Sequence, residues 1–277
     1  MTLTRQLVVN ADDFGFTRDV NRGIVEAHQS GILTAATLMA NGEAFDDAAR
    51  LAHENPSLDV GCHLVLVGGR SVLDPARELP ANVPQLLAAI ATRKIPVREE
   101  LAAQVRRILD AGISPTHLDT HKHTHLAPPV LDAVAEIAEE FHISWVRRPF
   151  DLPLTAARAK ASWLTRATSD GLQLVRARFH HVLAAHRCRT TDHFAGFQIT
   201  GRFRTAELVD LIKALPEGTT EFMCHPGRCT DELRAARTRL KESREWELEA
   251  LTAAETRRAL EDHDVILVNY RTLSSSD

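Results

Sequence analysis

The chain has 277 residues, 44% of them hydrophobic and 25% charged, which is enough for a large globular core. Its formal net charge is −4, so no overall basic field indicates nucleic acid as a partner. We find neither an apolar signal-peptide core nor an apolar run long enough to span a bilayer, and we expect a cytoplasmic protein. The four cysteines are scattered without a Cys-x-x-Cys pair, which fits reduced thiols better than a disulfide framework.

The first predicted strand ends in two adjacent acids. Residues 7–10 form a short apolar run with β-branched side chains, typical of a buried strand, and Asp12 and Asp13 follow it. Two buried carboxylates would repel each other unless a cation lay between them. One interpretation is therefore a metal ligand beside a free base. The alternative is an Asp-rich turn in which Gly15 supplies a permissive backbone.

The next candidate residue, His63, lies in a later strand. The elements expected in this part of the chain are a helix at 18–30, a strand at 33–39, a short helix at 45–52, a strand at 60–66, and helices at 86–91 and 101–109. A single histidine in an apolar strand is more often a core residue than a ligand. His63 is a metal candidate only in the company of Asp13 and His121. The loop 68–84, rich in glycine and proline, is typical of a segment that shapes a substrate entrance.

A histidine-rich segment, 116–125, holds four of the 14 histidines. A continued strand would direct four metal-competent side chains to one face, because they stand at alternate positions: Asp119, His121, His123 and His125. Lys122 would then point away from His121. A proline pair and a helical pattern at 130–141 follow, so the acid and the imidazoles stand at a strand's carboxyl end, where α/β barrels keep their chemistry. A polar, solvated turn is the alternative interpretation.

The segment 151–190 interrupts the alternation of strands and helices. A strand at 143–146 precedes it and ends in two arginines, of which Arg148 is a candidate substrate contact. The segment is basic, and apolar residues recur in it at helical spacing, which predicts a helical insertion with a solvated basic face. A second hypothesis is a lid that meets a lipid-like substrate or an anionic membrane surface. That lid would place the protein at the periphery of the inner membrane.

The last third of the chain returns to the strand–helix pattern and supplies His225. The expected elements are a strand at 193–197, a helix capped by Thr205, a strand at 219–224, a solvated charged stretch at 231–249, a helix opened by a Thr252/Glu255 capping box, and a strand at 264–268. His225 directly follows the strand 219–224 and either enters the site or is a turn histidine. Seven or eight strands, separated mostly by helices, predict a parallel (β/α) barrel in a single domain, 1–277.

Together, the strand ends predict an open metal site. One aspartate with His63 and His121 leaves room for water and substrate, and the second aspartate, Asp12, can act as a general base. His225 is placed to act as a general acid or to stabilise an oxyanion. A metal-activated water, a base and an acid make a hydrolase of amides or esters. Imidazole ligands suit Zn²⁺ or a similar first-row ion better than Mg²⁺.

Four motifs resemble those of the YdjC-like carbohydrate deacetylase family, in its order and spacing over nearly the whole chain: Val9–Gly15, Gly61–Leu64, Thr116–His121 and Met223–Gly227. The resemblance implies a distorted barrel similar to that of polysaccharide deacetylases, with metal-dependent removal of N-acetyl groups from sugars. It also implies Asp13, His63 and His121 as metal ligands and Asp12 as the base. The family's metal is often given as Mg²⁺, so the choice between Mg²⁺ and a Zn-like ion stays open.

Within this family, the chain is most similar to the hopanoid-biosynthesis-associated deacetylases, and the similarity includes residues 193–201 and the helix after them. The substrate implied is an N-acetylglucosaminyl lipid of hopanoid type, with a chitooligosaccharide as the alternative. Lys122 departs from the chitooligosaccharide-type members and leaves the substrate open. For three further residues we expect a role in orienting the ligating imidazoles or in contacting substrate: Asp119, His123 and His125.

Three other functions fit parts of the pattern. A metal-dependent phosphoesterase or amidohydrolase also uses His-x-His on a strand, but there the motif usually opens the first strand, which here carries Asp12 and Asp13. A glycosidase needs two carboxylates that flank the scissile bond, and adjacent aspartates diverge in direction. A non-catalytic sugar- or lipid-binding barrel would not need a free base such as Asp12 beside its metal.

Overall fold

The computed structural model of the chain describes residues 4–152 and 175–275. Among these residues, eight strands form one sheet in which every pairing is parallel. In chain order the strands are β1 (Arg5–Phe14), β2 (Ala35–Leu38), β3 (Asp59–Leu64), β4 (His117–Thr120), β5 (Trp145–Val146), β6 (His193–Ala195), β7 (Gly218–Cys224) and β8 (Val265–Leu267). The order in the sheet is β5-β4-β3-β2-β1-β7-β6, and β8 pairs with β1.

The sheet curls until its two edges approach each other. Trp145 of β5 forms an isolated parallel bridge with Arg189, and Asp151, just after β5, forms another with Phe194 of β6. These bridges connect the β5 edge to the β6 edge, so the arrangement is a distorted barrel. The predicted α/β barrel of seven or eight parallel strands is confirmed.

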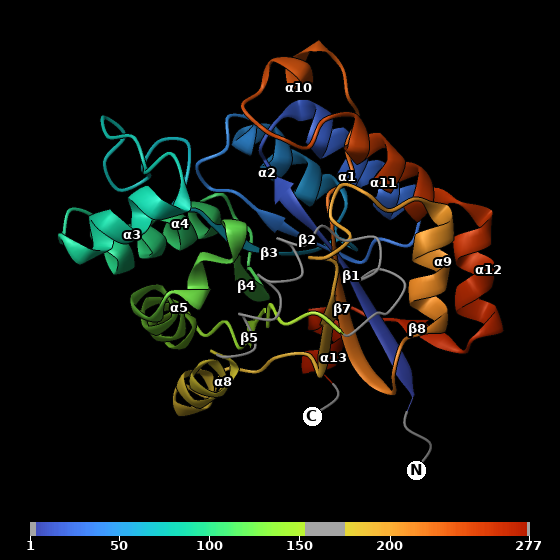
Figure 1. Cartoon of the computed structure of the whole chain (residues 1–277). Helices are drawn as coiled ribbons and strands as arrows, with labels where there is room; N and C mark the ends of the chain where they lie inside the picture. Colours follow the sequence, from blue (N-terminus) through green and yellow to red (C-terminus); the bar gives the residue numbers. More distant parts are fainter. Residues whose placement is uncertain (1–3, 153–174, 276–277) are drawn as a thin grey trace.

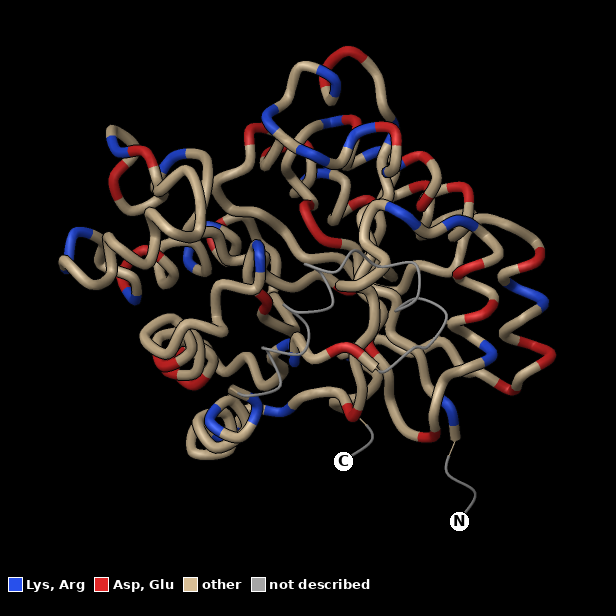
Figure 2. Tube along the Cα trace, viewed as in Figure 1, with Lys and Arg blue, Asp and Glu red and all other residues tan. Residues whose placement is uncertain are grey.

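Helices cover the outside of the sheet (Figure 1). They are α1 (Arg18–Ser30), α2 (Phe45–Glu54), α3 (Val83–Ala91), α4 (Val97–Asp110), α5 (Pro128–Glu140), α8 (Arg176–Ala185), α9 (Thr205–Lys213), α10 (Asp231–Ala235), α11 (Glu242–Thr252), α12 (Ala254–Asp262) and α13 (Tyr270–Ser274). Basic and acidic residues are interspersed along these outer helices (Figure 2). None of the helices in the described ranges is long and apolar enough to cross a membrane.

Local sequence explains why strand β1 and helix α1, which position the site, form where they do. In β1, every residue from Leu7 to Phe14 is buried, as expected for a central parallel strand that is covered on both faces. Helix α1 is capped by Thr17, whose side chain accepts a hydrogen bond from the backbone N–H of Val20 at 3.2 Å. Its face with Val20 and Ile24 is fully buried, and each such side chain contributes about 1.5–3 kcal/mol through burial.

Three expectations about helices and strands need correction. Helix α9 is capped by Arg204, whose backbone N–H bonds to the Glu207 carboxylate, so Thr205 is its first residue and not its cap. The capping box predicted at Thr252 is wrong, since that hydroxyl bonds back to the carbonyl of Leu248 within α11. The charged stretch 231–249 is only partly solvated, because Arg244 and Glu247 of α11 are each only 1% exposed.

The predicted insertion, 151–190, lies largely outside the described residues. Its described end contains α8, which lies against α5 and buries Phe179, Val182 and Leu183 in the core. Arg178 of α8 pairs with Asp132 of α5 at 2.9 Å on the solvent side. The amphipathic cover expected over the whole of 151–190 stays a prediction. The lid and membrane hypothesis remains a prediction.

Candidate active site

The carboxyl end of β1 carries two aspartates into one cavity. A regular strand would send Asp12 and Asp13 to opposite faces. Here the pairing of β1 with β2 shifts register between Ala11 and Phe14, and Asp13 adopts the left-handed conformation with φ of 69°. Aspartate tolerates this conformation better than most residues. The irregular strand end therefore brings both carboxylates to the same site.

The side chains of Asp13, His63 and His121 meet at one point. Asp13 Oδ1 lies 3.5 Å from His63 Nε2 and 3.4 Å from His121 Nδ1, and the two nitrogens are 3.2 Å apart. Ligands held tetrahedrally at ~2.0–2.1 Å from zinc would be separated by ~3.3 Å. Asp13 Oδ1 is also a buried oxygen without a hydrogen-bond partner. The three donor atoms therefore fit a divalent metal ion.

Asp119 and Thr37 orient the ring of His63. In the pairing of β3 with β4, His63 stands opposite Asp119, and His63 Nδ1 lies 2.7 Å from the Asp119 carboxylate. Thr37, on neighbouring β2, donates its hydroxyl to the same carboxylate at 3.1 Å. With Nδ1 committed to Asp119, Nε2 of His63 is left to face Asp13. This carboxylate–histidine arrangement is typical of metal sites.

Electrostatics at these three residues favour a cation. Burial raises the pKa of Asp13, but the Arg244 guanidinium and His121 outweigh it and hold that pKa well below its usual range. Burial lowers the pKa of His63, but Asp119 and the neighbouring carboxylates outweigh it and raise the pKa to about 9. His63 therefore holds a proton at neutral pH unless a metal ion takes that proton's place. Burial lowers the pKa of His121, which keeps its ring neutral and able to bind metal.

Asp12 is held by a buried arginine that follows β5. Arg147 donates to both oxygens of Asp12, at 2.9 and 2.7 Å, and also pairs with Asp119 at 2.5 Å and with Glu221 at 2.7 Å. Asp12, His63 and Asp119 also lie close enough to form a second metal-ligand set. Arg147 pairs with both of those carboxylates, and its positive charge disfavours a cation in this second set. Arg148, the arginine favoured from the sequence, donates instead to the backbone carbonyl of Asp192.

His225 faces Asp12 from the end of β7. Its Nε2 lies 3.9 Å from Asp12 Oδ2, and its backbone N–H donates to Glu247 at 2.5 Å. Burial lowers the pKa of His225 to about 3, so the ring is neutral. Burial also raises the pKa of Asp12 to about 7, against the opposing effect of Arg147. The site thus holds a carboxylate whose pKa is raised toward neutral beside a neutral imidazole.

The histidine-rich segment does not continue as a strand, so the predicted common face is wrong. β4 ends at Thr120, and residues 121–126 form a 3₁₀ turn in which Lys122 and His123 have φ of 57° and 51°. The Thr120 hydroxyl accepts from the backbone N–H of His125 at 3.1 Å, and this local bond competes with strand geometry. Lys122 lines the cavity beside His121, contrary to the expectation that it points away.

The two histidines of the segment that follow His121 have different surroundings. His125 is fully buried, and its ring lies 2.5 Å from the Thr120 hydroxyl and 3.1 Å from the carbonyl of Arg147. It therefore helps to place the backbone that carries Arg147. His123 lines the cavity, with its ring centroid 5.5 Å from that of Phe197. Both imidazoles are kept neutral, because burial lowers their pKa values.

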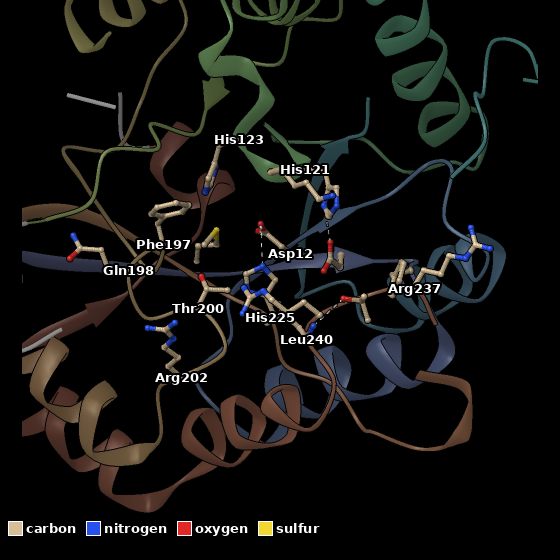
Figure 3. A pocket seen from close by; sticks show the side chains of 16 residues that line it. Asp12, His121, His123, Phe197, Gln198, Thr200, Arg202, His225, Arg237 and Leu240 are labelled. Carbon is tan, nitrogen blue, oxygen red and sulfur yellow. Dashed lines mark hydrogen bonds and ion pairs between the residues drawn. The ribbon is translucent and has the colours of Figure 1, made fainter. Parts of the chain in front are cut away.

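The cavity in front of these groups has a volume of about 660 Å³. Asp12 and His225 lie between the His121 side and a wall that carries His123 and Phe197 (Figure 3). Its rim includes four cations: Lys122, Arg202, Arg237 and Arg239. Asp12, His225 and two members of the triangle, Asp13 and His121, therefore open onto one space that is large enough for a small substrate.

Comparison with known proteins agrees with this arrangement. The sequence profile of the YdjC-like protein family matches residues 6–262. The chain belongs to this family. It is 34% identical over 276 residues to a carbohydrate deacetylase of Brevibacillus brevis, covering 97% of this chain and 99% of that one. It is 41% identical over 144 residues to a chitooligosaccharide deacetylase of Salmonella typhimurium, covering 50% of this chain and 57% of that one.

One solved structure supports the fold of this YdjC-like chain. It is a protein of Enterococcus faecalis V583, described as a candidate for cellobiose-phosphate cleavage. Its TM-score is 0.75 and its sequence identity 24%, with 98% of this chain and 99% of that chain covered. The likeness concerns the fold.

Sequence reasoning missed three charged residues of this YdjC-like site. Arg147 directly follows β5, as the other site residues follow their strands, and that position was the available indication. Arg244 and Glu247 belong to a stretch that looks solvated. Their spacing from Leu240, Leu248 and Leu251, however, places them on the apolar face of α11, and this pattern could have revealed them.

Proposed function

We propose that this protein is a metal-dependent carbohydrate deacetylase that removes the acetyl group from an N-acetylglucosamine-containing substrate. The observation that carries the proposal is the position of Asp12. It opens onto the same cavity as Asp13 and His121 of the metal triangle, yet Arg147 pairs with both of its oxygens and so disfavours its use as a metal ligand. The names of the two deacetylase relatives support the same chemistry.

Asp13, His63 and His121 would hold the metal. A divalent ion bound there would supply Lewis acidity toward the acetyl carbonyl and lower the pKa of a bound water. The triangle of 3.2 to 3.5 Å supports Zn²⁺ or a similar first-row ion over Mg²⁺, which prefers oxygen ligands. Asp119 holds His63 in the tautomer that presents Nε2.

Asp12 would take the proton from the attacking water. A general base works best when its pKa lies near the operating pH, and the pKa of Asp12, raised by burial to about 7, satisfies this condition. Arg147 fixes both carboxylate oxygens in place, so the base is oriented before substrate arrives. The cost of ordering this group at the moment of reaction is therefore small.

His225 would deliver a proton to the leaving amine nitrogen. Its ring is neutral before the reaction, because burial lowers its pKa, and its Nε2 lies 3.9 Å from Asp12 Oδ2. The proton that Asp12 removes from water can therefore reach His225 after a small movement, and from there the nitrogen. The second role for His225 is donation of its N–H to the carbonyl oxygen as negative charge develops there.

For the substrate, we propose an N-acetylglucosaminyl lipid of hopanoid type. Residues 193–201, which carry the resemblance to hopanoid-associated members, supply Phe197, Gln198 and Thr200 to the cavity wall. A chitooligosaccharide is the second candidate, favoured by the identity of 41% to the Salmonella relative. The lipid hypothesis also predicts peripheral contact with the inner membrane through 151–190.

Substrate competition tests the proposal directly. Purified protein would be given an N-acetylglucosaminyl lipid, an N-acetylated chitooligosaccharide and an aryl phosphate, and acetate, free amine and phosphate would be measured. We expect acetate and amine in equal amounts from the lipid, with less from the oligosaccharide. Greater release from the oligosaccharide would reject the lipid assignment alone. Phosphate release without acetate would reject the deacetylase and support the phosphoesterase.

A further inference from the structure

We propose that Arg244 is a positioning residue that occupies one oxygen of Asp13 and so leaves the other as the single Asp13 atom available to a metal. This inference rests on the metal site of the proposed function. The inference concerns how strongly Asp13 would bind a metal ion and through how many of its oxygens. None of the site residues described above determines these two properties.

The two oxygens of Asp13 are divided between two tasks. Arg244 Nη2 lies 2.5 Å from Asp13 Oδ2, and both side chains are buried. Oδ1 has no hydrogen-bond partner and faces the ring nitrogens of His63 and His121. A carboxylate with both oxygens free can bind a cation through two atoms. With Oδ2 paired, Asp13 offers one.

Residues next to helix α11 hold Arg244 in place from two sides. Arg244 Nε donates to the carbonyl of Leu240 at 3.3 Å, and its own carbonyl accepts from the N–H of Gly227 at 3.2 Å. Gly227 lies so close that an added Cβ would come within 3.1 Å of Arg244 Cδ. One turn further along, Glu247 accepts the backbone N–H groups of His225 and Gly201. The same helix therefore fixes the metal ligand and the opposite wall of the cavity.

The position of Arg244 has two consequences for a bound cation. Its positive charge offsets part of the Asp13 charge, so the cation is held less tightly and remains a stronger Lewis acid. A single Asp13 oxygen also leaves coordination positions for water and the acetyl oxygen. A purely structural ion pair would instead serve only to neutralise the buried carboxylate, and its loss would loosen both the fold and the metal site.

Arg244→Met and Arg244→Gln separate these roles, because Met removes charge and hydrogen bonds while Gln keeps a neutral donor. Arg258→Met is the control, since this arginine of α12 is exposed and pairs with Glu255, one turn earlier on the same helix. Zinc affinity would be measured by competition with a chelating dye, the coordination of Co²⁺ by its visible absorption, and turnover by acetate release. Circular dichroism would report folding.

We expect both Arg244 variants to bind zinc about ten-fold more tightly than the wild type, because a repelling charge is gone. We expect weaker Co²⁺ absorption, as for a higher coordination number, in Arg244→Met only, because Gln can still donate to Asp13 Oδ2. In both variants we expect kcat reduced about ten-fold with KM little changed. Arg258→Met should match the wild type in all four measurements. Unchanged or weaker zinc affinity, or variants that fail to fold with metal present, would overturn the role of Arg244. A wild type that binds no metal would instead reject the metal site itself.

Discussion

Replacing Asp12 by asparagine removes the proposed base with almost no change in shape. The carboxylate receives two hydrogen bonds from Arg147, at 2.9 and 2.7 Å. Asparagine can accept one of them, but its amide N–H₂ group must face the other guanidinium nitrogen. Arg147 keeps its pairs with Asp119 and Glu221, so the cation is not left alone. We expect a loss of about 1–3 kcal/mol in the free energy of unfolding.

The effect of this substitution on turnover should be far larger than its effect on the fold. An amide cannot take a proton from water, and loss of a general base lowers the rate by about 10²–10⁴-fold. The metal content should be unchanged, since the donor triangle consists of Asp13, His63 and His121. Asp12→Asn is therefore expected to be folded, metal-loaded and nearly inactive.

The assay for Asp12→Asn combines acetate release under saturating substrate with metal analysis of the dialysed protein. Asp13→Asn is the matched comparison, because the same chemical change at the neighbouring position should remove the metal as well as the activity. Asp12→Asn with more than about a third of the wild-type kcat would refute the assignment of the base. Loss of metal in Asp12→Asn with retention in Asp13→Asn would exchange the two roles.

Three further outcomes follow from the geometry. Asp12 must be ionised to act, and burial raises its pKa to about 7. We therefore expect kcat/KM to fall about ten-fold per pH unit below pH 7 and to level off above it. A pH profile that is flat down to pH 5 would contradict this role. If His225 is the general acid, His225→Ala should lose amide hydrolysis but keep hydrolysis of an aryl acetate, because the aryl leaving group needs no proton. Loss of both activities would show instead that His225 stabilises the oxyanion. Asp119→Asn should weaken metal affinity about 10–100-fold, measured by chelator competition, and unchanged affinity would show that it does not orient the ligating imidazole.

The barrel and the strand-end residues were predictable from local patterns. Short apolar runs marked the parallel strands, and polar groups directly after these runs marked the site, as for Asp12, Asp13 and His225. The carboxyl ends of parallel strands meet at one edge, so residues far apart in sequence could be brought together by topology alone. His63 was the exception, because it lies within an apolar strand like an ordinary core histidine. Only the presence of Asp13 and His121 at other strand ends made it a metal candidate.

Features that depend on irregular backbone were not predictable. Alternation assigned Asp12 and Asp13 to opposite directions, and the register shift in β1 brings them together. Alternation also extended β4 through the histidine-rich segment, where the Thr120 hydroxyl ends the strand instead. In both places a local hydrogen bond or a left-handed residue outweighs the period of the strand.

Charged site residues that come from distant elements could not be predicted from the sequence either. Arg147 and Arg244 lie 135 and 231 positions from the aspartates they hold. A buried charge is tolerated only when its partner is present, and the partner is known only from the tertiary structure. Arg148 was predicted instead of Arg147, and the sequence alone does not show which of two adjacent arginines after a strand enters the barrel.

The most direct test of this account is acetate release from an N-acetylglucosaminyl substrate before chelation, after chelation, and after addition of Zn²⁺, Co²⁺ or Mg²⁺ in turn. We predict that release ceases with the chelator and returns with a divalent ion, most fully with Zn²⁺ or Co²⁺. Release that continues undiminished in protein shown by elemental analysis to be free of metal would contradict the central claim, and Asp13, His63 and His121 would then need another role.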